Sequence, residues 1–250
     1  MTLVRPAALL ALLMTLLLGG CGMFGPPRDP QARDFPVQGI DVSRWQGDVD
    51  WNAVRRDDIG FAFIKATEGG DWTDPKFRQN FDRARAAGVR RAAYHFFYFC
   101  RPAMEQVEWF VRNVPYDPEA LPPVLDLEWG GNPSSCKYRP SREEARREIR
   151  VWLEAIAQIY HKRPVIYTSI DFNRDVLDGD FNDFPIWVRS VRAYPTKRYA
   201  NRRWTFWQYT EKGKVAGVHG HVDRNVFAGS RRQWQAFLDG EMDHSRIARL

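Results

Sequence analysis

The feature that most constrains the fold is a regular alternation of short apolar runs with polar segments of helical periodicity, which begins at Val37. Five strand-and-helix units are followed by three further apolar runs, so the pattern predicts eight strands. Strands that alternate with helices are typical of α/β domains with a parallel sheet, and eight of them favour a closed TIM-type barrel. A doubly wound open sheet is the alternative, but the chain lacks the glycine-rich phosphate loop that would support it.

The predicted elements can be given by their residue ranges. The strands are expected at Gln38–Val42, Ile59–Ala66, Ala92–Phe97, Val124–Glu128, Pro164–Thr168, Pro185–Val188, Trp204–Tyr209 and His219–Asp223. The helices are expected at Asp50–Arg56, Asp74–Ala87, Ala103–Asn113, Arg142–Tyr160 and Phe172–Leu177. Asp74 before Pro75 predicts a capped helix start, Gly88 predicts that helix's end, and Ser141 with Glu144 predicts a capping box.

Two acids close the fourth predicted strand. Asp126 and Glu128 are spaced i, i+2, which in a strand puts both on one face about 6.5–7 Å apart. Two such acids at the end of a buried strand repel each other, so one of them is expected to keep its proton near neutral pH, as a general acid must. The alternative is that both acids simply lie on a solvated strand edge without a catalytic role, because the pattern Asp-x-Glu alone is common.

Two more acids lie at matching positions, since Asp41 ends the first predicted strand and Asp223 the eighth. Functional residues of a barrel sit at the carboxyl ends of its strands, so we expect all four acids to meet in one mouth. The alternative for each single acid is that it caps a loop or pairs with Lys65 or a nearby Arg.

Aromatic and amide side chains are predicted at the same level of the barrel. They are Tyr94 and His95 on the third strand, Tyr167 on the fifth, Trp187 on the sixth, and Trp207 and Gln208 on the seventh. Aromatic faces beside carboxyl groups suit a carbohydrate, because sugar rings stack on them while hydroxyl groups meet acids and amides. Taken singly, each aromatic residue is more often a core residue.

The N-terminus predicts export. A charged start, a short apolar run and Leu18-Gly19-Gly20-Cys21 resemble a bacterial lipoprotein signal, so residues 1–20 are expected to be removed and Cys21 to be lipidated. Gly22 after the cysteine favours the outer membrane, on its periplasmic side. The alternative is an ordinary secretory signal with Cys21 incidental. Residues 21–36 are rich in Pro, Gly and charge and predict a tether to a domain at 37–238, followed by a tail at 239–250 without clear function.

Export also bears on the remaining cysteines and on the partners. Cys100 and Cys136 are an even pair in an oxidising compartment and are expected to be bridged, with two free buried thiols as the alternative.

The formal net charge of +6 fits an anionic cell-wall polymer or a membrane surface, and the export signal argues against nucleic acid. One stretch of the chain is especially rich in basic residues and could contact such an anionic surface, and the alternative is a solvated loop. It contains Arg189, Arg192, Lys197, Arg198, Arg202 and Arg203. We expect a monomer without cofactor or metal.

Five motifs in order resemble glycoside hydrolase family 25, the lysozymes or N-acetylmuramidases that cut the glycan of peptidoglycan. They are Gly39-Ile40-Asp41-Val42-Ser43-Arg44-Trp45-Gln46-Gly47, Phe63-Ile64-Lys65-Ala66-Thr67-Glu68-Gly69, Tyr94-His95-Phe96, Leu125-Asp126-Leu127-Glu128 and Trp207-Gln208-Tyr209. The resemblance covers residues 37–238 and implies a single-domain irregular barrel of the (β/α)5(β)3 type, which agrees with the missing late helices.

The resemblance also implies roles for single residues. Glu128 matches the proton donor, and Asp126, Asp41 and Asp223 match the other acids of the site. The implied reaction is hydrolysis with retention, and we expect Asp126 to orient the substrate's own acetamide as nucleophile, with Asp41 or Asp223 as the alternative nucleophile. The loop after Glu128 is longer than the family pattern and brings Cys136 near Cys100.

Two other functions are compatible with the sequence. His219, His221 and Asp223 alternate on one predicted strand and together with Asp41 could bind zinc, as in an amidase or deacetylase. The other rival is a lipoprotein that holds peptidoglycan without cutting it, against which the full set of acids argues.

Overall fold

The computed structural model describes residues 29–130, 136–200 and 202–241. The predicted signal peptide, the lipidated Cys21 and the end of the predicted tail lie outside these residues. The chain from Gln31 onward forms one compact unit. In the part of the chain that the structure describes, none of the helices combines the length and the apolar character needed to cross a bilayer.

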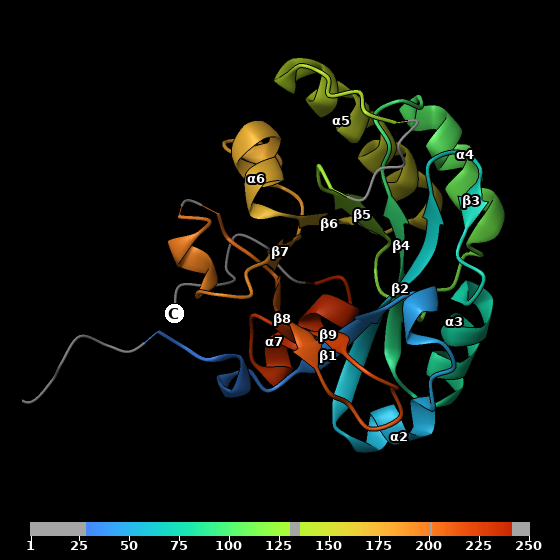
Figure 1. Ribbon diagram of the computed structural model, residues 1–250, viewed down its shortest axis with the longest axis vertical. Coiled ribbons are helices and arrows are strands. Elements are labelled where there is room, and N and C mark those ends of the chain that lie inside the picture. The colour runs from blue at the N-terminus through green and yellow to red at the C-terminus, as the bar shows by residue number, and fades with distance from the viewer. Residues whose placement is uncertain (1–28, 131–135, 201, 242–250) are drawn as a thin grey trace, which may run out of the picture. The chain divides into compact units, whose positions relative to one another are not determined.

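The centre of this unit is a closed barrel (Figure 1). Its strands in spatial order are β1 (Gln38–Val42), β9 (Val222–Phe227), β8 (Phe206–Gly213), β7 (Ile186–Arg189), β6 (Val165–Thr168), β5 (Val124–Leu127), β4 (Arg90–Phe96) and β2 (Ile59–Glu68), and β1 pairs with β2 to close the ring. The short β3 (Trp72–Thr73) pairs only with the end of β2. The predicted irregular α/β barrel is thus confirmed, with strand bounds that differ by a few residues.

The last strand corrects the expectation of a parallel barrel. β9 runs antiparallel to both of its neighbours, β1 and β8. It also begins at Val222 rather than at His219. Asp223 therefore lies near the start of its strand and not at the end, and the reversal of the strand brings it to the rim where the parallel strands finish.

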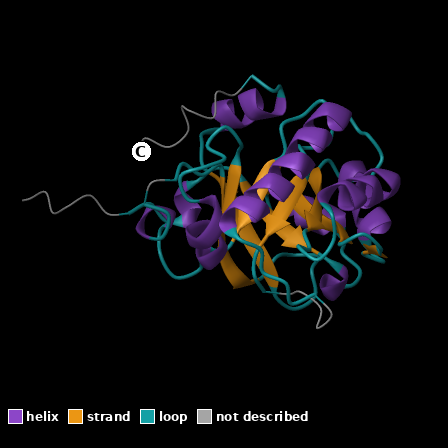
Figure 2. Cartoon of the chain, turned by 90° about the horizontal axis from the view of Figure 1, so that it is seen from above, coloured by secondary structure: helices purple, strands orange, loops and turns teal. Residues whose placement is uncertain are grey.

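Helices surround the strands on the outside (Figure 2). They are α2 (Trp51–Arg56), α3 (Phe77–Ala86), α4 (Ala103–Asn113), α5 (Arg142–Tyr160) and α6 (Ile170–Phe172), which continues as a π-helical turn at Asn173–Leu177. Short 3-10 turns occur at Ala32–Asp34, Arg44–Gln46 and Pro195–Lys197. The predicted start of the second helix at Asp74 is wrong by a few residues: α3 begins at Phe77, because the buried Asp74 carboxylate accepts from the backbone N–H groups of Arg44 and Lys76.

A helix that the sequence pattern did not reveal, α7 (Arg231–Leu238), closes the lower end of the barrel, which is the end where the parallel strands begin. The opposite end, where the parallel strands finish, is the upper rim. Trp234 packs against Phe61 and Phe227, and Phe237 packs against Phe206. These rings belong to a separate apolar cluster inside the barrel, whereas the larger cluster fills the layer between the strands and the outer helices. The barrel is therefore filled with side chains at this end, and a pocket lies at its upper rim.

The domain begins earlier than predicted. Phe35 is buried, and its ring contacts the rings of Trp204 and Trp207. The side-chain amide of Gln38 donates to the carbonyl groups of Ala32 and Phe35. Residues 31–36, which were expected to belong to the tether, thus pack on the barrel.

Candidate active site

The inward positions of the strands change from apolar to polar toward the upper rim. Side chains alternate between the two faces of a strand, so residues two apart share a face. Gly39 precedes Asp41 on β1, and a Cβ at Gly39 would lie 2.4 Å from the Phe61 ring, which fills the barrel there. In the same way Val124 precedes Asp126 on β5, and Phe206 precedes Gln208 on β8. The polar layer therefore rests directly on the aromatic interior.

This layer opens into a pocket of about 260 Å³. Its walls are Asp41, Tyr94, Asp126, Glu128, Tyr167, Trp187, Arg189, Gln208, Glu211 and Asp223. The structure thus brings together all four acids that the sequence singled out, with four of the six predicted aromatic, imidazole and amide residues around them.

Asp41 lies at the centre of a hydrogen-bonded network. Its Oδ2 accepts from the side-chain amides of Gln208 at 3.0 Å and Asn225 at 2.8 Å. Both amides are themselves oriented, because Tyr167 donates its hydroxyl to Gln208 Oε1 and Trp187 donates its indole N–H to Asn225 Oδ1. The aromatic walls of the pocket therefore also fix the orientation of the carboxyl group at its base.

Asp41 and Asp223 form a pair of interacting carboxyl groups. They are register partners on β1 and β9, and a hydrogen bond joins their side chains. Burial raises the pKa of Asp41 well above its ordinary value, the Asp223 charge raises it further, and the two amide donors oppose the rise. The pKa of Asp223 is also raised by burial, while its bond with Asp41 lowers it. The pair can accordingly hold a shared proton.

Asp126 has the environment of an unsatisfied acceptor. Its side chain is only 8% exposed, and Oδ1 has no hydrogen-bond partner among the residues that the structure describes. Burial raises its pKa well above the ordinary value, and the nearby Glu128 charge raises it further, whereas Lys65 lowers it. A buried acceptor without a partner costs free energy, which a donor on a bound molecule would recover.

Glu128 follows directly after β5 and is less buried than Asp126. Burial raises the pKa of Glu128, and the positive charge of Arg189 acts in the opposite direction. Burial likewise raises the pKa of Tyr94 and Tyr167 well above the ordinary value, so both phenols stay protonated and act as neutral donors. The pocket thus presents protonatable acids against neutral hydroxyl groups.

The predicted substrate contacts of His95 and Trp207 are wrong. Both side chains lie on the outer face of the barrel, one residue away from Tyr94 and Gln208, which face inward. His95 is fully buried, bonds Thr67 and Gln106, and stacks on Trp152. Trp207 donates to the Ser190 carbonyl. The strict alternation of strand side chains was the signal that separates these residues from their inward neighbours.

Two pocket residues were missed as site residues. Arg189 ends β7 and shares the face of Trp187, and it forms an ion pair with Glu211 on β8. Arg189 belongs to the dense basic stretch, for which a solvated loop is the alternative. That stretch is not uniform, because Arg189 is partly buried, and Arg202 is buried and donates to the carbonyl groups of Leu177 and Asp180.

The zinc alternative is not supported. His219 and His221 are exposed in the turn before β9 and do not alternate with Asp223 on a strand. Within the described ranges, no group of three or more His, Cys, Asp and Glu side chains is arranged to hold a metal ion.

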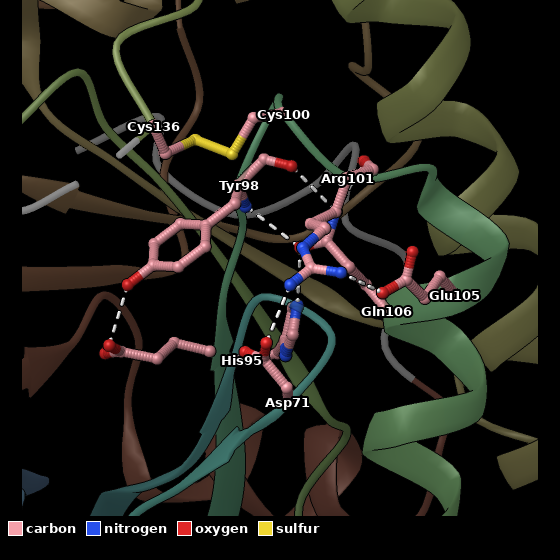
Figure 3. The surroundings of a disulfide bond; sticks show 9 residues. Asp71, His95, Tyr98, Cys100, Arg101, Glu105, Gln106 and Cys136 are labelled. Carbon is pink, nitrogen blue, oxygen red and sulfur yellow. Dashed lines mark hydrogen bonds and ion pairs between the residues drawn. A yellow bond between two sulfur atoms is a disulfide. The ribbon is translucent and has the colours of Figure 1, made fainter. Parts of the chain in front are cut away.

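The expected disulfide is present between Cys100 and Cys136 (Figure 3). Gln106 on α4 supports the first of these loops, because its side chain accepts from the Tyr98 N–H and donates to the carbonyl groups of Tyr98 and Arg101. His95 also bonds Gln106. The bridge therefore ties the loop after β4 to the segment after β5, which carries Glu128.

Comparison with known protein families decides what this barrel belongs to. The family model for glycosyl hydrolases family 25 matches residues 40–218, well over half of the chain. The chain belongs to glycosyl hydrolase family 25. The resemblance inferred from the five sequence motifs is confirmed, and so is the classification as a glycoside hydrolase.

Relatives of this family 25 hydrolase cover most of its length. It is 39% identical over 213 residues to Uncharacterized protein YegX from Escherichia coli O157:H7, covering 82% of this chain and 75% of that protein. It is 38% identical over 211 residues to Lysozyme M1 from Streptomyces globisporus, covering 78% and 68%. A solved family 25 glycosyl hydrolase from Bacillus anthracis superposes with a TM-score of 0.77 at 34% identity, covering 88% of this chain and 100% of that one.

Proposed function

We propose that this family 25 hydrolase is a peptidoglycan muramidase that cuts the β-1,4 bond between N-acetylmuramic acid and N-acetylglucosamine with retention. The observation that carries the proposal is the meeting of four carboxyl groups with raised pKa values in one pocket between aromatic walls. The similarity to Lysozyme M1 supports the same class of substrate. Neither the zinc alternative nor glycan binding without cleavage is favoured by an observation.

Glu128 is the proposed proton donor. It lies beyond the strand end, where its carboxyl group borders both the pocket and solvent. Burial raises its pKa, so a fraction of the enzyme keeps the proton that the leaving oxygen needs. After the sugar leaves, the ionised Glu128 takes a proton from the attacking water.

Asp126 is the proposed positioning group for the substrate's acetamide. Its unpartnered Oδ1 is an acceptor for the acetamide N–H, which would turn the acetamide oxygen toward the anomeric carbon. That hydrogen bond favours ionised Asp126. The negative charges of Asp126 and Glu128 repel each other, so substrate binding that ionises Asp126 would leave the proton on Glu128, where the reaction needs it.

Asp41 and Asp223 are proposed to stabilise positive charge on the sugar ring. Two amide donors hold the Asp41 carboxyl group, and Asp223 shares a hydrogen bond with it. A fixed, partly ionised pair beside the ring would stabilise an oxocarbenium-like transition state without reorganisation. This assigns the two acids an electrostatic role and leaves the attack to the acetamide.

Digestion of purified peptidoglycan tests the function. The soluble domain should release fragments with muramic acid at the new reducing end, identified by mass spectrometry after borohydride reduction. The first product measured by NMR should be the β-anomer, because the reaction retains configuration. Glucosamine at the new reducing end, or no new ends at all, would refute a muramidase. A covalent sugar adduct on Asp126 would refute the substrate-assisted route.

We also propose that the enzyme is a monomeric lipoprotein of the outer membrane facing the periplasm. The supporting feature is the sequence Leu18-Gly19-Gly20-Cys21 after a short apolar run, with Gly22 in the position that follows. Labelled fatty acid should enter the wild-type protein and not the C21A variant, and the label should follow the outer-membrane fraction. Light scattering of the soluble domain should give the mass of one chain.

A further inference from the structure

Arg44, in the turn that follows β1, has a side chain with no acid partner. No carboxylate of the described part of the chain lies within ion-pair distance of its guanidinium group. Instead the group lies over the ring of Trp45, 4.6 Å from its centroid, and over that of Trp72 at 5.2 Å. A cation held on two indole faces keeps its outer N–H donors available to a ligand.

The turn that presents Arg44 is rigidly held. Ser43 and Gln46 form a capping box around it, and the backbone N–H of Arg44 donates to Asp74 Oδ2 at 2.9 Å. Asp74 is itself buried, with 2% of its surface exposed. The backbone from which the Arg44 side chain projects is thus fixed before any ligand binds, which lowers the entropic cost of binding.

This turn is linked to the pocket through Trp72 and Lys65. The ammonium group of Lys65 also lies over the ring of Trp72, 5.3 Å from its centroid. The positive charge of Lys65 lowers the pKa of both Asp126 and Glu128. Trp45 is 78% exposed, which is a large apolar surface to leave in water without a ligand. Arg44 therefore continues the candidate active site outward along the rim.

We propose that Arg44, Trp45 and Trp72 form a subsite for a carboxylate carried by the glycan strand beside the cleaved bond. The proposal rests on the muramidase function and extends it. A planar guanidinium fork matches a carboxylate, and the indoles hold it flat. Peptidoglycan offers two sources of this group: the free lactyl carboxylate of a muramic acid without peptide, and the carboxylates of the stem peptide.

Kinetics on two substrates test the subsite. One is glycan that carries its stem peptides, and the other is the same glycan after an amidase has removed them and exposed the lactyl carboxylate. The R44Q variant should raise KM by roughly tenfold with kcat unchanged, as expected when one charge-assisted contact is lost. An increase on the peptide-bearing glycan identifies the stem peptide, and an increase only on the stripped glycan identifies the lactyl group. R44K should recover part of the loss.

The matched control is R55Q, which removes an equal charge from an exposed position on α2. The proposal is overturned if R44Q leaves KM unchanged on both glycans, if R55Q changes KM as much, or if R44Q lowers kcat alone. Its failure is separable from failure of the muramidase function. If the wild type releases no reducing ends, co-sedimentation with the two glycans still shows whether R44Q binds one of them more weakly.

Discussion

Asp41 on β1 and Asp223 on β9 face each other across an antiparallel pair of strands, and a hydrogen bond joins their carboxyl groups. The two residues come from the first and the last strand of the barrel. Their contact places one half of the candidate acid set opposite the other half, which β5 and the residue after it supply.

Replacing Glu128 by Gln should remove the proton donor and keep the shape of the pocket. The expected loss in kcat is about 10²–10⁴-fold, the usual contribution of general acid–base catalysis. Release of reducing ends measures it, and thermal unfolding verifies that the variant is folded. Near-normal turnover would eliminate Glu128 as the donor.

The ion pair of Arg189 and Glu211 should control the pH profile. The Arg189 charge opposes the burial that raises the pKa of Glu128, so R189Q should move the alkaline limb of kcat to higher pH. E211Q releases Arg189 from its partner and should move that limb the other way. Profiles of kcat between pH 4 and 9 measure both (about the range in which these groups titrate). Shifts of the same sign would contradict this account.

Asp126 should reduce stability at neutral pH. Its folded-state pKa is raised above the ordinary 3.8, so its contribution to stability is greatest below that value and is lost as pH rises through the folded pKa. D126N should therefore raise Tm at pH 7 and give no advantage below pH 3.8. D82N on α3, which replaces an exposed Asp, is the control. A lower Tm for D126N at pH 7 would contradict the expected cost of this buried acid.

His95 should make the protein sensitive to acid. Burial lowers its pKa from 6.5 to about 4, so the neutral ring contributes stability above pH 6.5 that is lost as pH falls toward 4. The free energy of unfolding of H95Q should consequently fall less over this range than that of the wild type, by about 3 kcal/mol. Denaturant titrations at several pH values measure the difference. H221Q, at an exposed histidine, should behave like the wild type.

The disulfide should contribute to stability through the unfolded chain. It joins residues 36 positions apart, and a loop of that length corresponds to about 3–4 kcal/mol in the chain-entropy model. Cys100 is exposed, so a reductant can reach the bridge. The wild type should lose Tm on reduction, whereas the variant with Ser at both positions should start lower and not respond. An equal response of both proteins would exclude the bridge as the cause.

The sequence predicted the parallel strands well because buried strands appear as continuous apolar runs, as at Val124–Leu127 and Val165–Thr168. It could not predict that β9 runs the other way, since direction depends on pairing with β1 and β8 rather than on local pattern. The helix α7 was missed although Ser230 and Gln233 form a readable capping box.

For the site, Asp41, Asp126 and Glu128 were predictable because each lies at or just beyond the carboxyl end of a strand, whereas Asp223 reaches the same rim near the start of the reversed β9. His95 and Trp207 were misassigned by proximity in sequence, although alternation puts them on the opposite face from Tyr94 and Gln208. Arg189 and Glu211 lie within β7 and β8 but beyond the predicted ends of these strands at Val188 and Tyr209, so their alternation with Trp187 and the other inward residues was not recognised. Their pairing across β7 and β8 is a property of the closed barrel.

Because β9 is the last strand of the barrel, the carboxyl pair at the rim forms only when the chain is complete through Asn225. Asp223 and Asn225 both reside on that closing strand, and without them Asp41 has neither its acid partner nor one of its two amide donors. A nascent or truncated chain that ends before β9 would contain Glu128 and Asp126 but could not complete the set of four acids at the rim.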